Sequence, residues 1–273
     1  MFLNSVVLIL QEILEAALLI SVLLVFTRLR DIRPFWAIAA IVIGTIGAYV
    51  FAHYIASISE WFDYVGQEVM NAFIQLTIVL ILAIFVTKYL GNTTSSHGPQ
   101  INTGFIACTL LLVALSLTRE GSEIFLYIGG ALSDPSHVQP TLTGSGIGAG
   151  IGISAGILIY YGLLWLPSKW ITTSGLLLLS LIGGNMASQA TLLLTQADWL
   201  PYSRILWDTT TWLPENSILG QLLYAIIGYE ATPSLFQACS YAAGILLILL
   251  CAKLSFGNQL PLNIKQTLTS TPQ

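Results

Sequence analysis

The sequence predicts an all-α polytopic membrane protein with seven transmembrane helices, arranged as a 3+3 inverted repeat plus a seventh helix. Three observations support this fold class. Of 273 residues, 55% are hydrophobic and 8% are charged, whereas a soluble domain carries about 25% charged residues. The apolar residues form seven runs long enough to cross a hydrocarbon core of about 30 Å. Nearly all basic residues follow alternate runs, as expected when successive helices cross a membrane in opposite directions.

The apolar runs give the expected helix boundaries. Short polar or turn-rich segments separate the first six runs, among them residues 133–140 between the fourth and the fifth. The only long connection precedes the seventh run, and it contains an apolar stretch from Ile218 to Gly228. This stretch predicts either a short interfacial helix or a re-entrant segment. The seven runs cover residues 3–26, 35–56, 70–90, 103–129, 144–166, 171–194 and 234–254.

We expect a single transmembrane domain over residues 1–273. Its expected parts are repeat one at about 1–90, repeat two at about 103–195, an outer loop at 196–233, the seventh helix at 234–254 and a cytoplasmic tail at 255–273.

The charges predict that the N-terminus is outside and the C-terminus is cytoplasmic, because basic residues favour the cytoplasmic side. An acidic outer face would concentrate cations, although acids also fill outer loops simply because lysine is excluded from them. The basic residues on the expected inner side are Arg28, Arg30, Arg33, Lys88, Lys169, Lys253 and Lys265. The expected outer side carries Arg204 and the acids Glu60, Asp63, Glu68, Asp134, Asp198, Asp208, Glu215 and Glu230.

Two pairs of glutamates lie inside apolar runs. Glu12 and Glu15 belong to the first run, and Glu120 and Glu123 belong to the fourth. The spacing E-x-x-E places both carboxylates of a pair on one helical face, about one turn apart. A charged side chain at membrane depth costs roughly 2.5–3.5 kcal/mol on insertion scales, and such residues usually mark a functional site. The duplicated motif therefore predicts a site inside the membrane.

The position of the two motifs predicts their relative orientation. Helix one would run from outside to inside and helix four from inside to outside, so the second motif is inverted relative to the first. Inverted repeats are common in secondary transporters, where the site lies near the midplane between the halves. We therefore expect the two glutamate pairs to face each other as half-sites.

Paired carboxylates favour a hard cation, because hard cations take oxygen ligands. Four carboxylates supply most of the shell of an iron ion, either Fe³⁺ or Fe²⁺, and metal entry would release protons from them. Arg119 adjoins Glu120 and lies one turn from Glu123, so it is expected to hold a carboxylate by a bidentate bond. The alternative is that protonated acids only form hydrogen bonds between helices.

At these residues the chain resembles the iron permease family, the oxidase-dependent iron transporters of bacteria and fungi. That family carries R-E-x-x-E in its first and fourth helices. The fourth-helix copy is complete here with Arg119, whereas Gln11 stands where the first copy has arginine. The resemblance continues through residues 186–189, 206–209, 220–223 and 227–230.

The resemblance implies a permease, not an enzyme, that carries iron into the cytoplasm across a bacterial inner membrane. It implies iron as the transported substrate and no organic cofactor. It leaves open whether the permease works with a separate oxidase or periplasmic iron-handling protein or works alone. Neither a nucleophile triad nor a nucleic-acid-binding patch is present in the sequence. A homo-oligomer, the oxidation state of the iron and the effect of Gln11 stay open.

Other polar residues are candidates for roles along the ion path. Glu60, Asp63 and Glu68 are expected either to capture cations at the outer side or to form an ordinary solvated loop. Asn185 and Gln189, one turn apart in the sixth run, would line the path or bond across helices.

Three other functions compete with iron import on the sequence alone. One is transport of a different divalent metal such as Mn²⁺ or Zn²⁺, and another is an intramembrane metal-binding redox protein. The third, a scaffold that transports nothing, leaves the buried acids unexplained.

Overall fold

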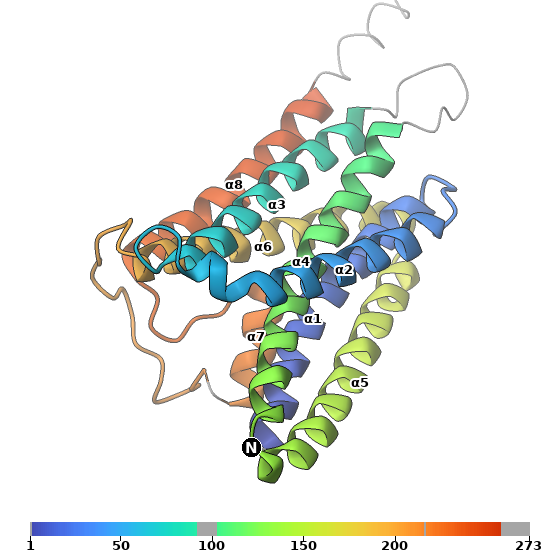
Figure 1. Ribbon diagram of the computed structural model, residues 1–273. Helices are drawn as coiled ribbons and strands as arrows, with labels where there is room; N and C mark the ends of the chain where they lie inside the picture. Colours follow the sequence, from blue (N-terminus) through green and yellow to red (C-terminus); the bar gives the residue numbers. More distant parts are fainter. Residues whose placement is uncertain (1, 92–102, 216, 258–273) are drawn as a thin grey trace, which may run out of the picture.

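The computed structural model describes residues 2–91, 103–215 and 217–257, and this part of the chain is helical (Figure 1). Seven of its helices are long and apolar enough to cross a membrane. The helices are α1 (Phe2–Arg28), α2 (Phe35–Ser59), α3 (Gly66–Gly91), α4 (Thr103–Leu132), α5 (Pro135–Trp165), α6 (Ser168–Gln196), the short α7 (Ile218–Ile227) and α8 (Leu235–Gly257).

The predicted loop at 133–140 is wrong, because α5 already begins at Pro135. The Asp134 side chain caps the helix by accepting a hydrogen bond of 2.9 Å from the Ser136 backbone N–H. Bonds from Ser136 also lower the pKa of Asp134. Proline is well tolerated in the first turn of a helix, and Pro140 lies within α5, where it removes a single backbone donor. Most of the predicted cytoplasmic tail, 258–273, lies outside the described residues.

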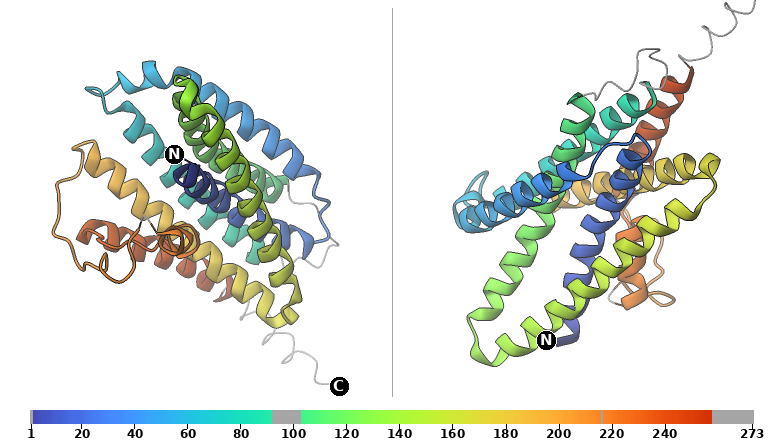
Figure 2. Two further views of the ribbon diagram at one scale, coloured as in Figure 1. Left: turned by 90° about the horizontal axis from the view of Figure 1, so that it is seen from below. Right: turned by 90° about the vertical axis from the view of Figure 1, so that its right-hand side faces the viewer.

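Different helices form the interior and the surface of the bundle. Most of α1 and α6 is buried, whereas α2, α5 and α8 are largely exposed. The exposed faces are apolar, with side chains such as Ile38, Leu158 and Leu254, and so they suit contact with lipid. In the left view of Figure 2, which is seen from below, the N-terminal end of α1 lies among the other helices. The first motif is therefore carried by a helix in the interior.

Two pairs of helices distant in sequence pack closely, α2 on α4 and α5 on α1. Glycines permit both contacts. A Cβ at Gly44 would lie 2.6 Å from the Leu117 Cβ atom, and one at Gly148 would lie 3.0 Å from the Leu10 backbone nitrogen. Small residues allow helices to approach this closely. The buried residues of α5 are mostly small ones on the face toward α1.

An aromatic cluster fills the interior at the ends of α1 and α3 and the start of α4. The ring of Phe26 lies 4.5 Å from that of Tyr89, and the ring of Phe85 lies 4.9 Å from that of Phe105. Arg30 donates a hydrogen bond to the Tyr89 carbonyl oxygen, and its guanidinium lies 4.7 Å above the Tyr89 ring. This end of the interior is closed by packed rings.

The apolar stretch of the long connection forms α7, which packs against α1 and α6. The Ser217 hydroxyl caps its start by accepting a bond from the Gly220 N–H. Its end is set by Gly228, whose φ of 69° lies in the left-handed region that glycine adopts without strain. Asn185 on α6 donates a bond of 3.4 Å to the Tyr224 carbonyl oxygen. The short helix is thus fixed to the bundle by both apolar packing and a buried amide.

Candidate functional site

The glutamates of the two motifs meet where α1 and α4 pack together in the bundle interior. Glu12 is 5% exposed, Glu15 4% and Glu120 1%. Glu123 differs, because 32% of its side-chain surface is accessible.

Arg119 lies among three of these carboxylates. Its Nη1 atom is 2.6 Å from Glu120 Oε1 and 3.4 Å from Glu15 Oε2. Its Nη2 atom is 3.2 Å from Glu123 Oε1. The guanidinium therefore joins the α4 pair to the α1 pair and offsets one of their charges. Because buried acids without a counter-charge are costly, this arginine stabilises the site when no metal is bound.

Two glutamines connect the site to α3 and α6. The Gln75 amide donates a bond of 2.6 Å to the Gln189 carbonyl oxygen, and the Gln189 amide donates one of 3.3 Å to Glu15 Oε2. Because the Glu15 carboxylate can only accept from Gln189, the amide nitrogen of Gln189 must face it, and the amide nitrogen of Gln75 must then face the Gln189 oxygen. The Gln75 oxygen is left at the far end of this series of hydrogen bonds. That oxygen is buried and has no partner within the described residues.

The Gln75 oxygen is one of several buried oxygens around the site that lack a hydrogen-bond partner. A buried polar atom without a partner costs about 1–3 kcal/mol, and native structures contain few of them. Those named below lie on the glutamates and on α3 beside them, and oxygen atoms are the ligands that hard cations prefer. Within the described residues they include Glu12 Oε2, Glu15 Oε1, Glu120 Oε2, Asn71 Oδ1 and Gln75 Oε1.

The four carboxylates do not surround a space that could hold a metal ion. In the part of the chain that the structure describes, no three acidic, histidine or cysteine side chains are arranged to hold a metal ion. Arg119 occupies the centre instead, and Glu123 is displaced toward the surface. Binding of an ion by all four glutamates would therefore require the Arg119 guanidinium to move aside.

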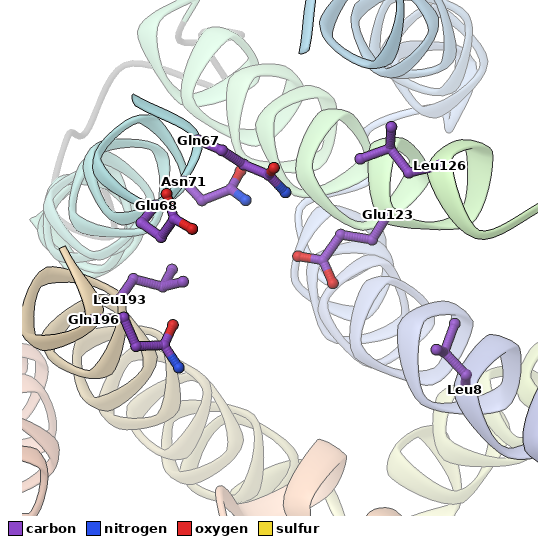
Figure 3. A pocket seen from close by; sticks show the side chains of 8 residues that line it. All are labelled: Leu8, Gln67, Glu68, Asn71, Glu123, Leu126, Leu193 and Gln196. Atoms are coloured by element: carbon purple, nitrogen blue, oxygen red, sulfur yellow. The ribbon is translucent and has the colours of Figure 1, made fainter. Parts of the chain in front are cut away.

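A cavity of about 340 Å³ leads to Glu123. Figure 3 shows the Glu123 carboxylate directed across this cavity toward α3 and α6. The walls come from four helices, and the residues that line the cavity are Leu8, Gln67, Glu68, Asn71, Glu123, Leu126, Leu193 and Gln196.

The structure brings some of the other candidate residues from the sequence to the site and places others away from it. Glu68 lines the cavity, whereas Glu60 and Asp63 are exposed and do not. Gln189 contacts the site, whereas Asn185 bonds to the α7 backbone. Gln11 is partly buried on α1, and within the described residues its side chain makes no hydrogen bond, unlike that of Arg119.

Asn71 and Gln75 on α3 were missed by the sequence reasoning, although a signal was present. They form the pattern N-x-x-x-Q, and the same pattern recurs on α6 as Asn185 and Gln189. Residues four apart lie on one helical face. A pair of amides that recurs on α3 and α6, like the glutamate pair that recurs on α1 and α4, would have pointed to Asn71 and Gln75.

An all-helical bundle with seven candidate spans and a buried group of acids around one arginine belongs to the class of multi-pass membrane transporters. The sequence comparisons name the family. Residues 2–256 match the model of the iron permease FTR1 family. The chain belongs to that family, whose members are transporters of iron and not enzymes.

Curated relatives are distant. A protein described as ferrous iron permease EfeU from Yersinia pestis is 24% identical over 249 residues, covering 85% of this chain and 86% of the relative. One of the same description from Escherichia coli O6:K15:H31 is 23% identical over 246 residues, covering 84% and 87%. An uncharacterized protein from Synechocystis is 26% identical over 151 residues, covering 48% of each chain. No solved structure matches the chain.

Proposed function

We propose that this protein imports iron, as Fe²⁺, across a bacterial inner membrane through a site formed by Glu12, Glu15, Glu120 and Glu123. The observation that carries the proposal is the meeting of both glutamate pairs around Arg119 in the interior. Family membership supplies the metal, and the printed description of the relatives, ferrous iron permease, favours the ferrous ion.

The same proposal includes the inverted repeat and an N-terminus on the outer side. Three features support the repeat: the duplicated E-x-x-E, the duplicated N-x-x-x-Q, and the reciprocal packing of α2 on α4 and α5 on α1. With this orientation, the cavity at Glu123 opens outward, and the aromatic cluster with Arg30 closes the cytoplasmic end. The described conformation then corresponds to an outward-facing state, in which Glu68 meets the ion first.

The test is Fe²⁺ uptake into liposomes that contain the purified protein under anaerobic conditions. Each single Glu→Gln change at positions 12, 15, 120 and 123 should reduce uptake at least tenfold, while the protein still inserts and elutes normally. Asp198→Asn is the matched control, because Asp198 is an exposed acid with a φ of 56° that asparagine tolerates. If all four glutamine variants take up iron at the rate of the control, the proposal is wrong.

A further inference from the structure

The cavity beside Glu123 has the lining of a binding site in its own right. Carboxylates enter it from two helices, Glu68 from α3 and Glu123 from α4. The amide side chains of Gln67, Asn71 and Gln196 also line it, and neither sulfur nor imidazole contributes. Such a set of oxygen donors suits a hard cation.

An unsatisfied buried amide marks the inner wall of this cavity. Asn71 is 4% exposed, lines the cavity, and its Oδ1 atom has no hydrogen-bond partner within the described residues. One turn deeper on the same face of α3, Gln75 is 0% exposed and its Oε1 atom is also unpartnered. Two amide oxygens one turn apart on α3 therefore lack a partner within the described residues. One belongs to the cavity wall, and the other belongs to the residue that is linked to Glu15 through Gln189.

The size of the cavity suits an ion that keeps part of its water. Six waters occupy roughly 180 Å³ at about 30 Å³ each, which is less than the cavity volume of about 340 Å³. Small divalent cations lose their waters reluctantly. An outer site that replaces only some waters by protein oxygens would thus be easier to enter than the drier glutamate site behind it.

We propose that Glu68, Asn71 and Glu123 form a second cation site, which holds a partly hydrated divalent cation before it reaches Glu12, Glu15 and Glu120. This inference rests on the proposed function for the direction of movement, but the site itself follows from the cavity lining and the unpartnered Asn71 oxygen. Gln75 offers the next oxygen on the way inward.

Glu123 connects the two sites. Its Oε1 atom lies 3.2 Å from Arg119 Nη2, while its carboxylate faces the cavity. A cation bound beside Glu123 competes with the guanidinium for this carboxylate, because both are attracted to the same charge. Filling the outer site would therefore weaken the hold of Arg119 on the α4 pair and open the way to the inner glutamates.

The experiment measures Fe²⁺ binding by anaerobic equilibrium titration of the full-length protein in lipid nanodiscs, together with uptake kinetics in liposomes. Wild type should bind two ions per chain. Asn71→Leu and Glu68→Gln should each bind one, and should raise the KM of uptake about tenfold while the maximal rate stays within twofold. Asn71→Asp, which keeps an oxygen in place, should still bind two.

Controls separate a lost site from a damaged protein. Thr77→Val removes a hydroxyl from the exposed face of the same helix, where it bonds only to the Phe73 carbonyl oxygen, and it should bind two ions. If Asn71→Leu does not fold, Glu68→Gln and Asn71→Asp decide the question. Two ions bound with unchanged KM in Glu68→Gln and Asn71→Leu would overturn the outer site, as would one ion in wild type.

A double variant distinguishes this inference from the proposed function. Glu12→Gln with Glu15→Gln should lose uptake and still bind one ion in the cavity. If that variant transports iron at the wild-type rate, the proposed central site is wrong, whereas the outer site is judged by the ion count alone. If it binds no ion at all, the outer site is overturned.

Discussion

Helices α1 to α3, the first half of the bundle in sequence order, and α4 to α6, the second, carry E-x-x-E and N-x-x-x-Q in different surroundings. In the second half, Asn185 is covered by α7 and donates to its backbone; in the first half, Asn71 faces a cavity with its oxygen unpaired. The glutamate motifs differ as well, because α4 contributes Arg119 whereas α1 contributes only Gln11. The amide motif thus has one copy bonded to the protein and one whose asparagine oxygen faces a cavity without a partner, and the unpartnered copy is the one we propose binds an ion.

The largest effect is expected from removing the charge that joins the halves. Arg119→Gln leaves buried carboxylates without their counter-charge, and breaking a buried ion pair in this way costs about 3–5 kcal/mol. We expect a clearly lower thermal unfolding temperature in detergent and less than a tenth of the wild-type Fe²⁺ uptake. Arg119→Lys keeps the charge but not the forked geometry. Its unfolding temperature and its uptake rate should lie between those of wild type and those of Arg119→Gln.

Added metal provides the sharper part of this test. If a divalent cation takes the place of the guanidinium, Fe²⁺ should stabilise Arg119→Gln more than it stabilises wild type, because a ligand stabilises the state that binds it. Equal stabilisation of both proteins would contradict the competition between Arg119 and the ion. Normal stability of the metal-free variant would show that the arginine does not balance these acids.

A smaller effect is expected from loosening α7. Gly228→Ala places a Cβ atom at a φ of 69°, 2.9 Å from Asn185 Oδ1. The left-handed conformation alone costs an alanine roughly 1–2 kcal/mol, so the unfolding temperature should fall by several degrees. Limited proteolysis should also cut more rapidly within residues 217–234. Gly150→Ala, at an exposed glycine of α5 whose Cβ would meet nothing within 4 Å, should change neither, and equal effects of both changes would exclude a special role for the α7 end.

Apolar run length was enough to predict the seven candidate spans, because each helix must cross the same thickness of hydrocarbon. The sequence analysis began the fifth helix at residue 144 because residues 133–140 are polar or turn-rich, whereas Asp134 caps a helix that begins at Pro135. Local sequence cannot show whether a helix continues through a proline with the loss of a single backbone hydrogen bond.

The site was predictable only as far as its residues were unusual for a membrane helix. Four glutamates in apolar runs stand out, but single amides such as Asn71 and Gln75 do not, and their importance depends on which neighbours they face. The central place of Arg119 was also hidden, because contact with Glu15 across 104 positions requires the packing of α1 on α4. The spacing of residues within a helix predicts which side chains share a face, but only the tertiary fold shows which residues that face contacts.

The smallest effect is expected from making the two motifs alike by Gln11→Arg. Gln11 adjoins Glu12 and precedes Glu15 by four positions, the same relation that Arg119 has to Glu120 and Glu123. A second guanidinium would change the charge of the four ionised glutamates and their arginines from −3 to −2, because one positive charge is added. We expect Fe²⁺ affinity to fall about threefold to tenfold, or roughly 0.7–1.4 kcal/mol, with unchanged stability. Gln11→Leu, which adds no charge, should bind as wild type does, so tighter binding by Gln11→Arg would mean that the arginine orders the α1 carboxylates more than it repels the ion.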